Sequence, residues 1–279
     1  MKPVFDAEDL DLSRPEVAAH YDELPLWSAP FGQLILDRVP LRAGQTVVDV
    51  GAGTGFLTVE LAQRCGPTSR VIAVDPWAAA MDVLRDKCRY LGLTNVQLQV
   101  GGADAVDLGD RSVDVVVSNL GLNNVDDAAA VLSECHRVLR PGGTLLTSSN
   151  LVGHLAEFYD VFRETLTGVG RTDRLPALDA EIAHRATVGS MSRQLEQAGF
   201  DLVDTATGSF TMRYADGTAL LHHYFIRLGF LPGWRAVVGP GDGGEVFAEL
   251  ERRLNARARA AGSLDLSVPM ACVTARRPG

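Results

Sequence analysis

Short apolar runs rich in β-branched residues alternate with longer amphipathic segments through the first half of the chain. Each run is short enough for a buried strand, and the segments between the runs repeat apolar residues at helical spacing. We expect strands at 45–50, 70–75, 95–100, 112–119 and 144–150, and helices at 54–65, 78–92 and 126–143. Strands that alternate with helices predict right-handed βαβ units and a parallel sheet covered on both faces.

The pattern is less regular after residue 150. Residues 151–186 are mostly helical in pattern, with Pro176 interrupting them. Beyond them we expect helices at 190–200, 217–229 and 244–261 and strands at 201–214 and 264–277. Pro269 lies within the last of these strands and favours an edge or bulge position there, because proline cannot donate to a sheet ladder.

The composition is that of an ordinary globular protein. The 279 residues are 46% hydrophobic and 22% charged, with a formal net charge of −9. Because broad capture of nucleic acid needs many Lys or Arg contacts to phosphate, we expect no nucleic-acid partner. No run approaches the roughly 20 apolar residues of a membrane span, and the acidic start has no signal core. We therefore expect a cytoplasmic protein that binds no membrane.

The four cysteines are scattered through the chain and form no pair or Cys/His cluster at metal spacing. We interpret them as buried free thiols and expect no metal site. The arginines of 251–260 are interpreted as a solvated helix face rather than a nucleic-acid patch.

Three glycines, Gly51, Gly53 and Gly55, stand in five positions between a predicted strand and a predicted helix. Such a turn brings backbone N–H groups and a helix N-terminus to the carboxyl edge of the sheet, where open α/β sheets bind ligands. The spacing is G-x-G-x-G, with Phe56 where a dinucleotide fingerprint would have its third glycine. Asp49 precedes the turn, either as a cap for it or as a counter-charge for an ammonium group.

Asp75 ends the next predicted strand, twenty residues after Gly55. A carboxylate there can accept hydrogen bonds from both hydroxyls of a ribose, and it can also cap the helix that starts near Trp77. These two functions do not exclude each other. The glycine turn and Asp75 together indicate a nucleoside site that would serve NAD or another adenosine-bearing ligand.

Two further stretches reduce this ambiguity: "GGADAVDLGDRSVDVVVSN", and "HRVLRPGGTLL" after it. With "VVDVGAGTG" and "VIAVDP" they form an ordered series that resembles the class I S-adenosylmethionine-dependent methyltransferases, especially the small-molecule branch related to the ubiquinone and menaquinone biosynthesis methyltransferases. The resemblance covers about residues 45–150. It implies a Rossmann-like, doubly wound, seven-stranded α/β sheet that ends in an antiparallel hairpin, here 201–214 with 264–277, and it implies S-adenosyl-L-methionine as cofactor, with S-adenosyl-L-homocysteine as its product.

The resemblance also implies roles for individual residues. Gly51 and Gly53, with Ala52 between them, would let the backbone approach the methionyl chain, and Asp49 would stand near its ammonium group. Asp75 would hold the ribose. The adenine would lie against Pro76 and Trp77, near Ala103, Asp104 and Ala105, and Asn119 and Leu120 would close the site near the sulfonium. Trp77 could instead serve helix packing alone, and Asp104 could instead cap its loop.

The expected organisation is one structural domain in three parts. Residues 1–40 would form a lid that carries Tyr21 as a contact to cofactor or substrate. Residues 41–150 would form the cofactor-binding core, and 151–279 a helical cap plus the last two strands. Candidate bases or orienting groups are His154, Glu157, His222 and His223. For each of them a structural role is the favoured alternative. A base is needed only if the methyl acceptor carries a proton at neutral pH.

The expected function is methyl transfer to an O, N or C atom of a small molecule, with secondary metabolism as one setting. Three alternatives remain: a methyltransferase acting on RNA or protein, a nicotinamide-dependent oxidoreductase, and a non-catalytic binding module. We leave the oligomeric state open, with a homodimer as the alternative to a monomer.

Overall fold

A computed structural model describes residues 10–22, 26–241 and 243–279 of the chain. These residues form two compact units. We call residues 11–150, 186–208 and 270–279 the sheet unit, and residues 151–185 and 209–269 with Leu10 the helical unit. One boundary between the units follows residue 150, and residues 186–208 and 270–279 return to the sheet unit.

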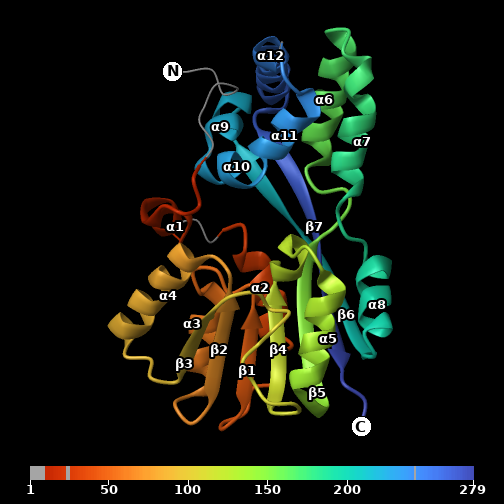
Figure 1. Ribbon diagram of the computed structural model, residues 1–279. Helices are drawn as coiled ribbons and strands as arrows, with labels where there is room; N and C mark the ends of the chain where they lie inside the picture. The colour runs from red at the N-terminus through yellow and green to blue at the C-terminus, as the bar shows by residue number, and fades with distance from the viewer. Residues whose placement is uncertain (1–9, 23–25, 242) are drawn as a thin grey trace. The chain divides into compact units, whose positions relative to one another are not determined.

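The sheet has seven strands in the order β3-β2-β1-β4-β5-β7-β6 (Figure 1). The strands are β1 (Thr46–Val50), β2 (Arg70–Asp75), β3 (Val96–Val100), β4 (Val113–Asn119), β5 (Leu139–Asn150), β6 (Asp201–Tyr214) and β7 (Leu264–Arg276). The first five pair in parallel, whereas β7 pairs with β5 in the antiparallel sense, with Thr147 opposite Val273. This order confirms the predicted Rossmann-like sheet with its antiparallel end. Along the chain, β6 and β7 each continue from one unit into the other.

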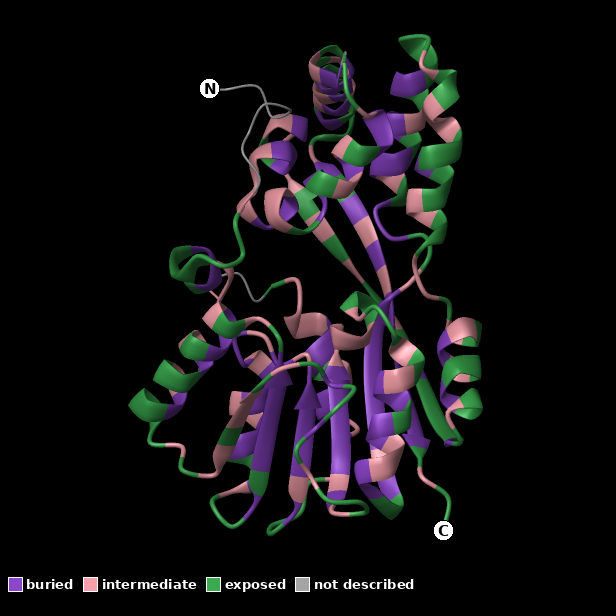
Figure 2. Cartoon of the chain, in the orientation of Figure 1, coloured by how far each residue is buried: buried purple, intermediate pink, exposed green. Residues whose placement is uncertain are grey.

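The helices of the sheet unit are α1 (Pro15–Asp22), α2 (Ala29–Leu36), α3 (Phe56–Cys65), α4 (Ala78–Leu91), α5 (Ala128–Val138) and α8 (Val188–Gln197), with a 3-10 turn η2 (Gly121–Asn124). Apolar residues of β1, β2, β4 and α3 form one buried cluster that includes Val47, Leu61 and Val115. Figure 2 shows the central strands buried along their length. Buried on both faces, these strands need continuous apolar runs, which is why their sequence signal is strong.

The helical unit contains α6 (Ala156–Gly168), η3 (Thr172–Arg174), α7 (Leu175–Ala183), α9 (Gly217–His222), α10 (Tyr224–Gly229), α11 (Leu231–Val238) and α12 (Gly243–Ala261). Its core is aromatic: Phe158 stacks on Trp234 with ring centroids 3.9 Å apart, and Phe162 lies next to Phe158. Pro176 stands in the first turn of α7, where the missing N–H costs nothing, so it starts this helix instead of interrupting one.

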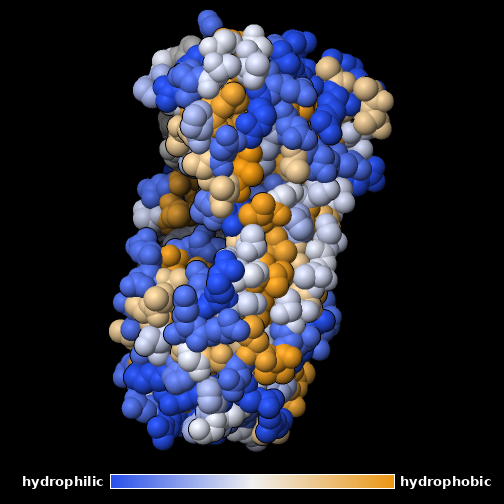
Figure 3. Space-filling model, turned by 90° about the vertical axis from the view of Figure 1, so that its right-hand side faces the viewer, coloured by the Kyte–Doolittle hydropathy of each residue, from blue (hydrophilic) through white to orange (hydrophobic). Residues whose placement is uncertain are grey.

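The edge strand β6 leaves part of its surface exposed. Leu202 and Val203 are exposed on it. Figure 3 views the molecule from the side on which Figure 1 draws β6 and α8, and hydrophobic residues gather there.

Within the described ranges, none of the helices combines the length and apolar character that a membrane crossing requires. All four cysteines are buried and free, as the sequence predicts.

Candidate functional site

The turn after β1 has a different neighbour at each glycine. Gly51, Gly53 and Gly55 all have positive φ, at 75°, 54° and 88°. A Cβ on Gly51 would lie 2.6 Å from the Cα of Gly121 in η2, whereas a Cβ on Gly53 would meet nothing within 4 Å. Gly51 is therefore required by the close approach of two backbones, and Gly53 presents an open side.

Asp75 fixes this turn to the end of β2. Its Oδ2 accepts a hydrogen bond from the backbone N–H of Gly53 at 2.8 Å, and its Oδ1 accepts from the N–H of Trp77 at 2.7 Å. Burial raises the pKa of Asp75, and these two hydrogen bonds oppose that rise. Asp75 therefore holds the residue before α4 in a turn. Among the described residues α4 itself, whose N-cap is Trp77, has no side-chain cap hydrogen bond, so the alternative that Asp75 caps this helix is not seen.

Asp49 is a buried carboxylate at the end of β1, with 1% of its surface exposed. Its Oδ2 accepts a 2.6 Å hydrogen bond from the hydroxyl of Thr58 on α3. Its Oδ1 has no hydrogen-bond partner among the described residues. Burial raises the pKa of Asp49 to about 7, helped by the charge of Asp75 and opposed by the Thr58 hydrogen bond. A buried acceptor atom without a partner is uncommon and needs an explanation.

The end of β4 is held by side-chain amides and hydroxyls. Asn119 donates from Nδ2 to the carbonyl of Ser28 at 3.1 Å and accepts from the hydroxyl of Ser148 at 2.8 Å. Leu120 follows with φ of 64°, a left-handed conformation that is strained for leucine. The described contacts of the Asn119 side chain therefore tie β4 to β5 and to the residue before α2.

The loop after β3 presents the three residues predicted near an adenine ring. Ala103 is buried, whereas Asp104, Ala105 and Pro76 are exposed. The carbonyl of Ala105 accepts from the amide of Gln99 at 3.1 Å, which fixes the loop to β3.

Tyr21 and Trp77 contact each other at the same edge. Their ring centroids are 5.4 Å apart in an edge-to-face arrangement, and the indole N–H donates to the carbonyl of Leu12 at 2.5 Å. Burial raises the pKa of the Tyr21 phenol, and the charge of Asp75 adds to the rise. The segment before the core thus brings Tyr21 close to the predicted ribose carboxylate.

Sequence reasoning missed Thr58 and Gly121. Thr58 is a fully buried hydroxyl on the apolar face of α3, and a polar residue at such a position was its available signal. Gly121 has no comparable local signal, because only the folded sheet brings it against Gly51.

His154 and Glu157, in the helical unit, are both engaged by neighbours. The Arg185 guanidinium donates from Nε to Nε2 of the buried His154 at 2.9 Å. Burial, followed by the charge of Arg185, lowers the pKa of His154 to about 3. Because Nε2 acts as acceptor, the neutral ring carries its proton on Nδ1. The carboxylate of Glu157 accepts from the N–H of Ser267 at 2.9 Å and from its hydroxyl at 2.6 Å.

His222 has the opposite tautomer. Its Nδ1 lies 2.9 Å from the carbonyl of Thr218, which can only accept, so Nδ1 carries the proton and Nε2 has the lone pair. This Nε2 of His222 is buried without a hydrogen-bond partner among the described residues, and so is Nδ1 of His223. Burial lowers the pKa of His223. Nδ1 of His154 is likewise buried without a partner among the described residues, but it carries the proton, so the lone pair of His154 is already used, whereas that of His222 is available.

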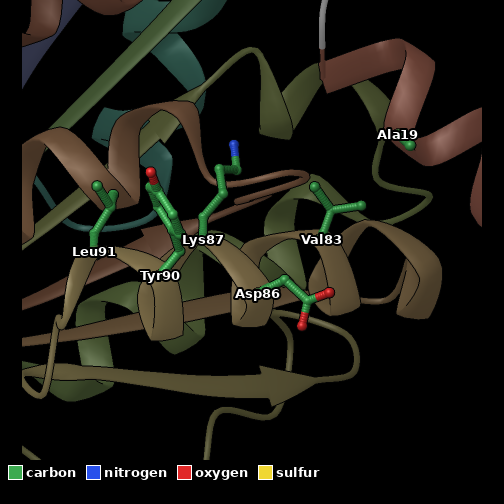
Figure 4. A pocket seen from close by; sticks show the side chains of 6 residues that line it. All are labelled: Ala19, Val83, Asp86, Lys87, Tyr90 and Leu91. Carbon is green, nitrogen blue, oxygen red and sulfur yellow. The ribbon is translucent and has the colours of Figure 1, made fainter.

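A shallow pocket of about 540 Å³ lies elsewhere on the sheet unit, between α1 and α4. Figure 4 shows its lining residues: Ala19, Val83, Asp86, Lys87, Tyr90 and Leu91. None of the predicted site residues lines it. In the part of the chain that the structure describes, no group of three or more His, Cys, Asp or Glu side chains is arranged to hold a metal ion.

The sheet order, the glycine turn and the two strand-end carboxylates define a nucleoside-binding methyltransferase fold, and the chain belongs to the class I S-adenosylmethionine-dependent methyltransferases. Residues 48–147 match a family described as a methyltransferase domain. The ubiquinone/menaquinone biosynthesis C-methyltransferase UbiE of Klebsiella pneumoniae is 30% identical over 207 residues, which cover 67% of this chain and 81% of the relative.

Two solved structures share the fold. The YcgJ protein of Bacillus subtilis superimposes with a TM-score of 0.59 at 15% identity, over 90% of this chain and 99% of that one. A SAM-dependent methyltransferase of Aquifex aeolicus superimposes with a TM-score of 0.53 at 19% identity, over 69% of this chain and 92% of that one. The family establishes an enzyme that uses S-adenosylmethionine as methyl donor, and the oxidoreductase alternative is thereby set aside.

Proposed function

We propose that this enzyme methylates a carbon atom of a small, electron-rich acceptor such as a quinol-type aromatic ring. One observation carries the choice of carbon over oxygen or nitrogen: the relative that the chain matches over 81% of its length is named a C-methyltransferase of ubiquinone and menaquinone biosynthesis. The cofactor supplies a methyl carbon made electrophilic by a sulfonium. The protein's part is to hold donor and acceptor in line and to exclude water.

The proposed cofactor site is the carboxyl edge of β1, β2 and β4. The partnerless Oδ1 of Asp49 suits the methionyl ammonium group, directly or through water. The open side of Gly53 suits close approach of the methionyl chain, with Gly51 and Ala52 completing the turn. These features support the assignment, because the first is a buried acceptor without a partner among the described residues and the second leaves room beside the backbone.

Asp75 keeps acceptor capacity for a ribose. A carboxylate has about four acceptor positions, and the two backbone N–H groups that it binds use one on each oxygen. Around it we assign Tyr21, Pro76 and Trp77 to the nucleoside, with Ala103, Asp104 and Ala105 near the adenine and Asn119 and Leu120 near the sulfur. The Asn119 side chain uses one N–H for Ser28 and one lone pair for Ser148, so it too keeps capacity for a ligand contact.

A base is required only where the acceptor loses a proton. His222 is the proposed base, with His223 as the second candidate, because a lone pair is available at Nε2 of His222. His154 is unsuited to this role because Arg185 occupies its lone pair. Glu157 is proposed to support the fold through Ser267.

Methyl transfer can be measured by incubating the enzyme with methyl-labelled S-adenosylmethionine and a panel of quinols, phenols, amines and RNA. We expect label in quinols or similar rings, on carbon by mass spectrometry. Label only on RNA would instead support the macromolecule alternative, and label only on amines or hydroxyl oxygens would contradict C-methylation. A cytoplasmic location and a homodimer stay predictions, and gel filtration with light scattering tests the latter.

Calorimetric titration with S-adenosylhomocysteine tests the site. We expect Asp75→Asn to weaken binding at least tenfold, since the neutral amide is a poorer acceptor for two hydroxyls. Asp107→Asn, on an exposed residue beyond the adenine loop, is the matched control and should bind normally. Unchanged affinity in Asp75→Asn would place the cofactor elsewhere.

A further inference from the structure

Two buried carboxylates lie at the carboxyl ends of neighbouring strands of the sheet unit: Asp49 is the penultimate residue of β1 and Asp75 the last residue of β2. Asp49 is 1% exposed and Asp75 is 9% exposed. In the β1–β2 ladder Asp49 lies opposite Ala73, two residues before Asp75, so both side chains belong to the carboxyl edge. Burial of two like charges at one edge disfavours ionising both, and one of the pair holds a proton more readily than an isolated carboxyl would.

The hydrogen bonds show which of the two holds that proton. Asp75 accepts from two backbone N–H groups, which favour its ionised form. Asp49 accepts only from Thr58 among the described residues, and its Oδ1 has no partner. The proton of the pair therefore belongs to Asp49, in agreement with its pKa of about 7.

Among the described residues, the elements packed against Asp49 bring no positive charge to it. On β2 the charged neighbour is Asp75, on β4 the residue opposite is Val117, and on α3 the contacting group is the hydroxyl of Thr58. Tyr21 reaches the same edge as a neutral phenol whose pKa is raised by its surroundings. A bound ligand with an ammonium group would supply a cation to Asp49.

We propose that the ammonium group of the cofactor displaces a proton from Asp49 when it binds, so that cofactor and product affinity rise with pH. The inference rests on the proposed cofactor site. In this step the ammonium keeps its three protons, the Asp49 carboxyl loses one to solvent, and no covalent bond to carbon or sulfur changes. Binding and release of the methyl donor and its product are thereby coupled to the pH of the surroundings.

The proton release can be counted by calorimetric titration of S-adenosylhomocysteine in two buffers of different ionisation enthalpy. For one group with a pKa of about 7 that ionises on binding, linkage predicts release of about 0.9 proton near pH 6 and about 0.1 near pH 8, with affinity rising about tenfold between them. Methylthioadenosine lacks the amino acid portion, so we expect it to release no proton at either pH.

Two variants separate Asp49 from other groups. Asp49→Asn has no proton to lose and should bind S-adenosylhomocysteine, if at all, without release. Thr58→Val removes the hydrogen bond that favours ionised Asp49, so release should continue to higher pH than in the wild type. If Asp49→Asn binds too weakly to measure, the pH dependence of proton release in Thr58→Val is the test of whether Asp49 is the group that loses the proton.

Each outcome has a definite meaning. Binding of S-adenosylhomocysteine by the wild type without proton release overturns the coupling and leaves the cofactor site intact. Equal release with methylthioadenosine, or undiminished release in Asp49→Asn, assigns the proton to another group and also overturns it. Failure of the wild type to bind S-adenosylhomocysteine would overturn the proposed site itself.

Discussion

Replacing Gly51 and Gly53 by alanine, one at a time, tests the geometry of the turn after β1. Both residues have positive φ, so each alanine pays about 1–2 kcal/mol for a left-handed backbone. Only at Gly51 does the added Cβ meet another backbone, at 2.6 Å from the Cα of Gly121. Backbone cannot move aside as a side chain can, and overpacking of this kind costs about 1–3 kcal/mol more.

Urea unfolding of the two variants measures the difference. We expect Gly51→Ala to lose about 2–5 kcal/mol of unfolding free energy and Gly53→Ala to lose about 1–2 kcal/mol. Affinity for S-adenosylhomocysteine should fall at least tenfold in Gly53→Ala, because its methyl group occupies the open side of the turn. Gly121→Ala repeats the first test from the other partner, since its Cβ would lie 2.4 Å from the carbonyl oxygen of Val50.

Equal stability of Gly51→Ala and Gly53→Ala would show that the turn and η2 do not approach each other as the structure has them. Normal binding of S-adenosylhomocysteine by Gly53→Ala would show that the open side of this glycine does not face the ligand. The two readouts are independent, so each can fail without the other.

Three further predictions concern titratable groups: two are substitutions and one is a titration of the unchanged protein. Asp49→Asn should stabilise the unliganded protein most near pH 8 and not near pH 4. Burial raises the pKa of the Asp49 carboxyl to about 7, so the wild type loses stability as pH rises through that value. Thermal unfolding of the variant and the wild type at both pH values checks this. Ser267→Ala should cost about 1 kcal/mol of unfolding free energy at neutral pH and less in acid. Burial raises the pKa of Glu157, but the hydrogen bonds from Ser267 outweigh this and lower it, so they stabilise the fold mainly when Glu157 is ionised. Denaturant titration at each pH measures the cost, and a cost that does not change with pH would contradict this. The ring of His154 should not titrate between pH 5 and 8 in NMR spectra, and a midpoint near 6.5 would refute its burial against Arg185.

The sequence predicted the strands well because burial on both faces demands unbroken apolar runs. The observed β2 and β6 have the predicted bounds, and β1, β3 and β4 begin one residue later than predicted. The helix before β5 was predicted to be stopped by Pro141-Gly142-Gly143, yet it already ends at Val138. Pro141 and Gly142 instead lie inside β5, where the pairing with β4 is irregular between Val113 and Val115. A local stop signal does not reveal that a strand can absorb it as a bulge.

The helical unit was harder to predict. The single helix expected at 217–229 is two helices, α9 and α10, because His223 between them has an extended ψ of 130°. The segment of α11 was not expected to be helical, although Pro232 suits the first turn of a helix. Here tertiary packing around Trp234, which is fully buried, outweighs a weak local preference.

For the site, sequence reasoning singles out residues whose own chemistry suggests a role, and it misses residues whose role depends on a distant partner. Asp49 and Asp75 were predicted because each ends a strand and a carboxylate has few other uses there. Gly121 and Thr58 were not, because their roles exist only through the residues that the fold brings to them.

The same reasoning explains why the donor can be inferred and the acceptor must be tested. The matched family domain spans residues 48–147, which include the glycine turn and both strand-end carboxylates. His154 and His222 lie beyond it, and their surroundings assign them different chemistry: His154 has a donor N–H and His222 an acceptor nitrogen. A change of His222 to Asn retains an acceptor and removes the base, so it should spare binding and slow only reactions in which the acceptor loses a proton. If quinol methylation proceeds at the wild-type rate in His222→Asn, the proton is taken by another group and His222 is structural.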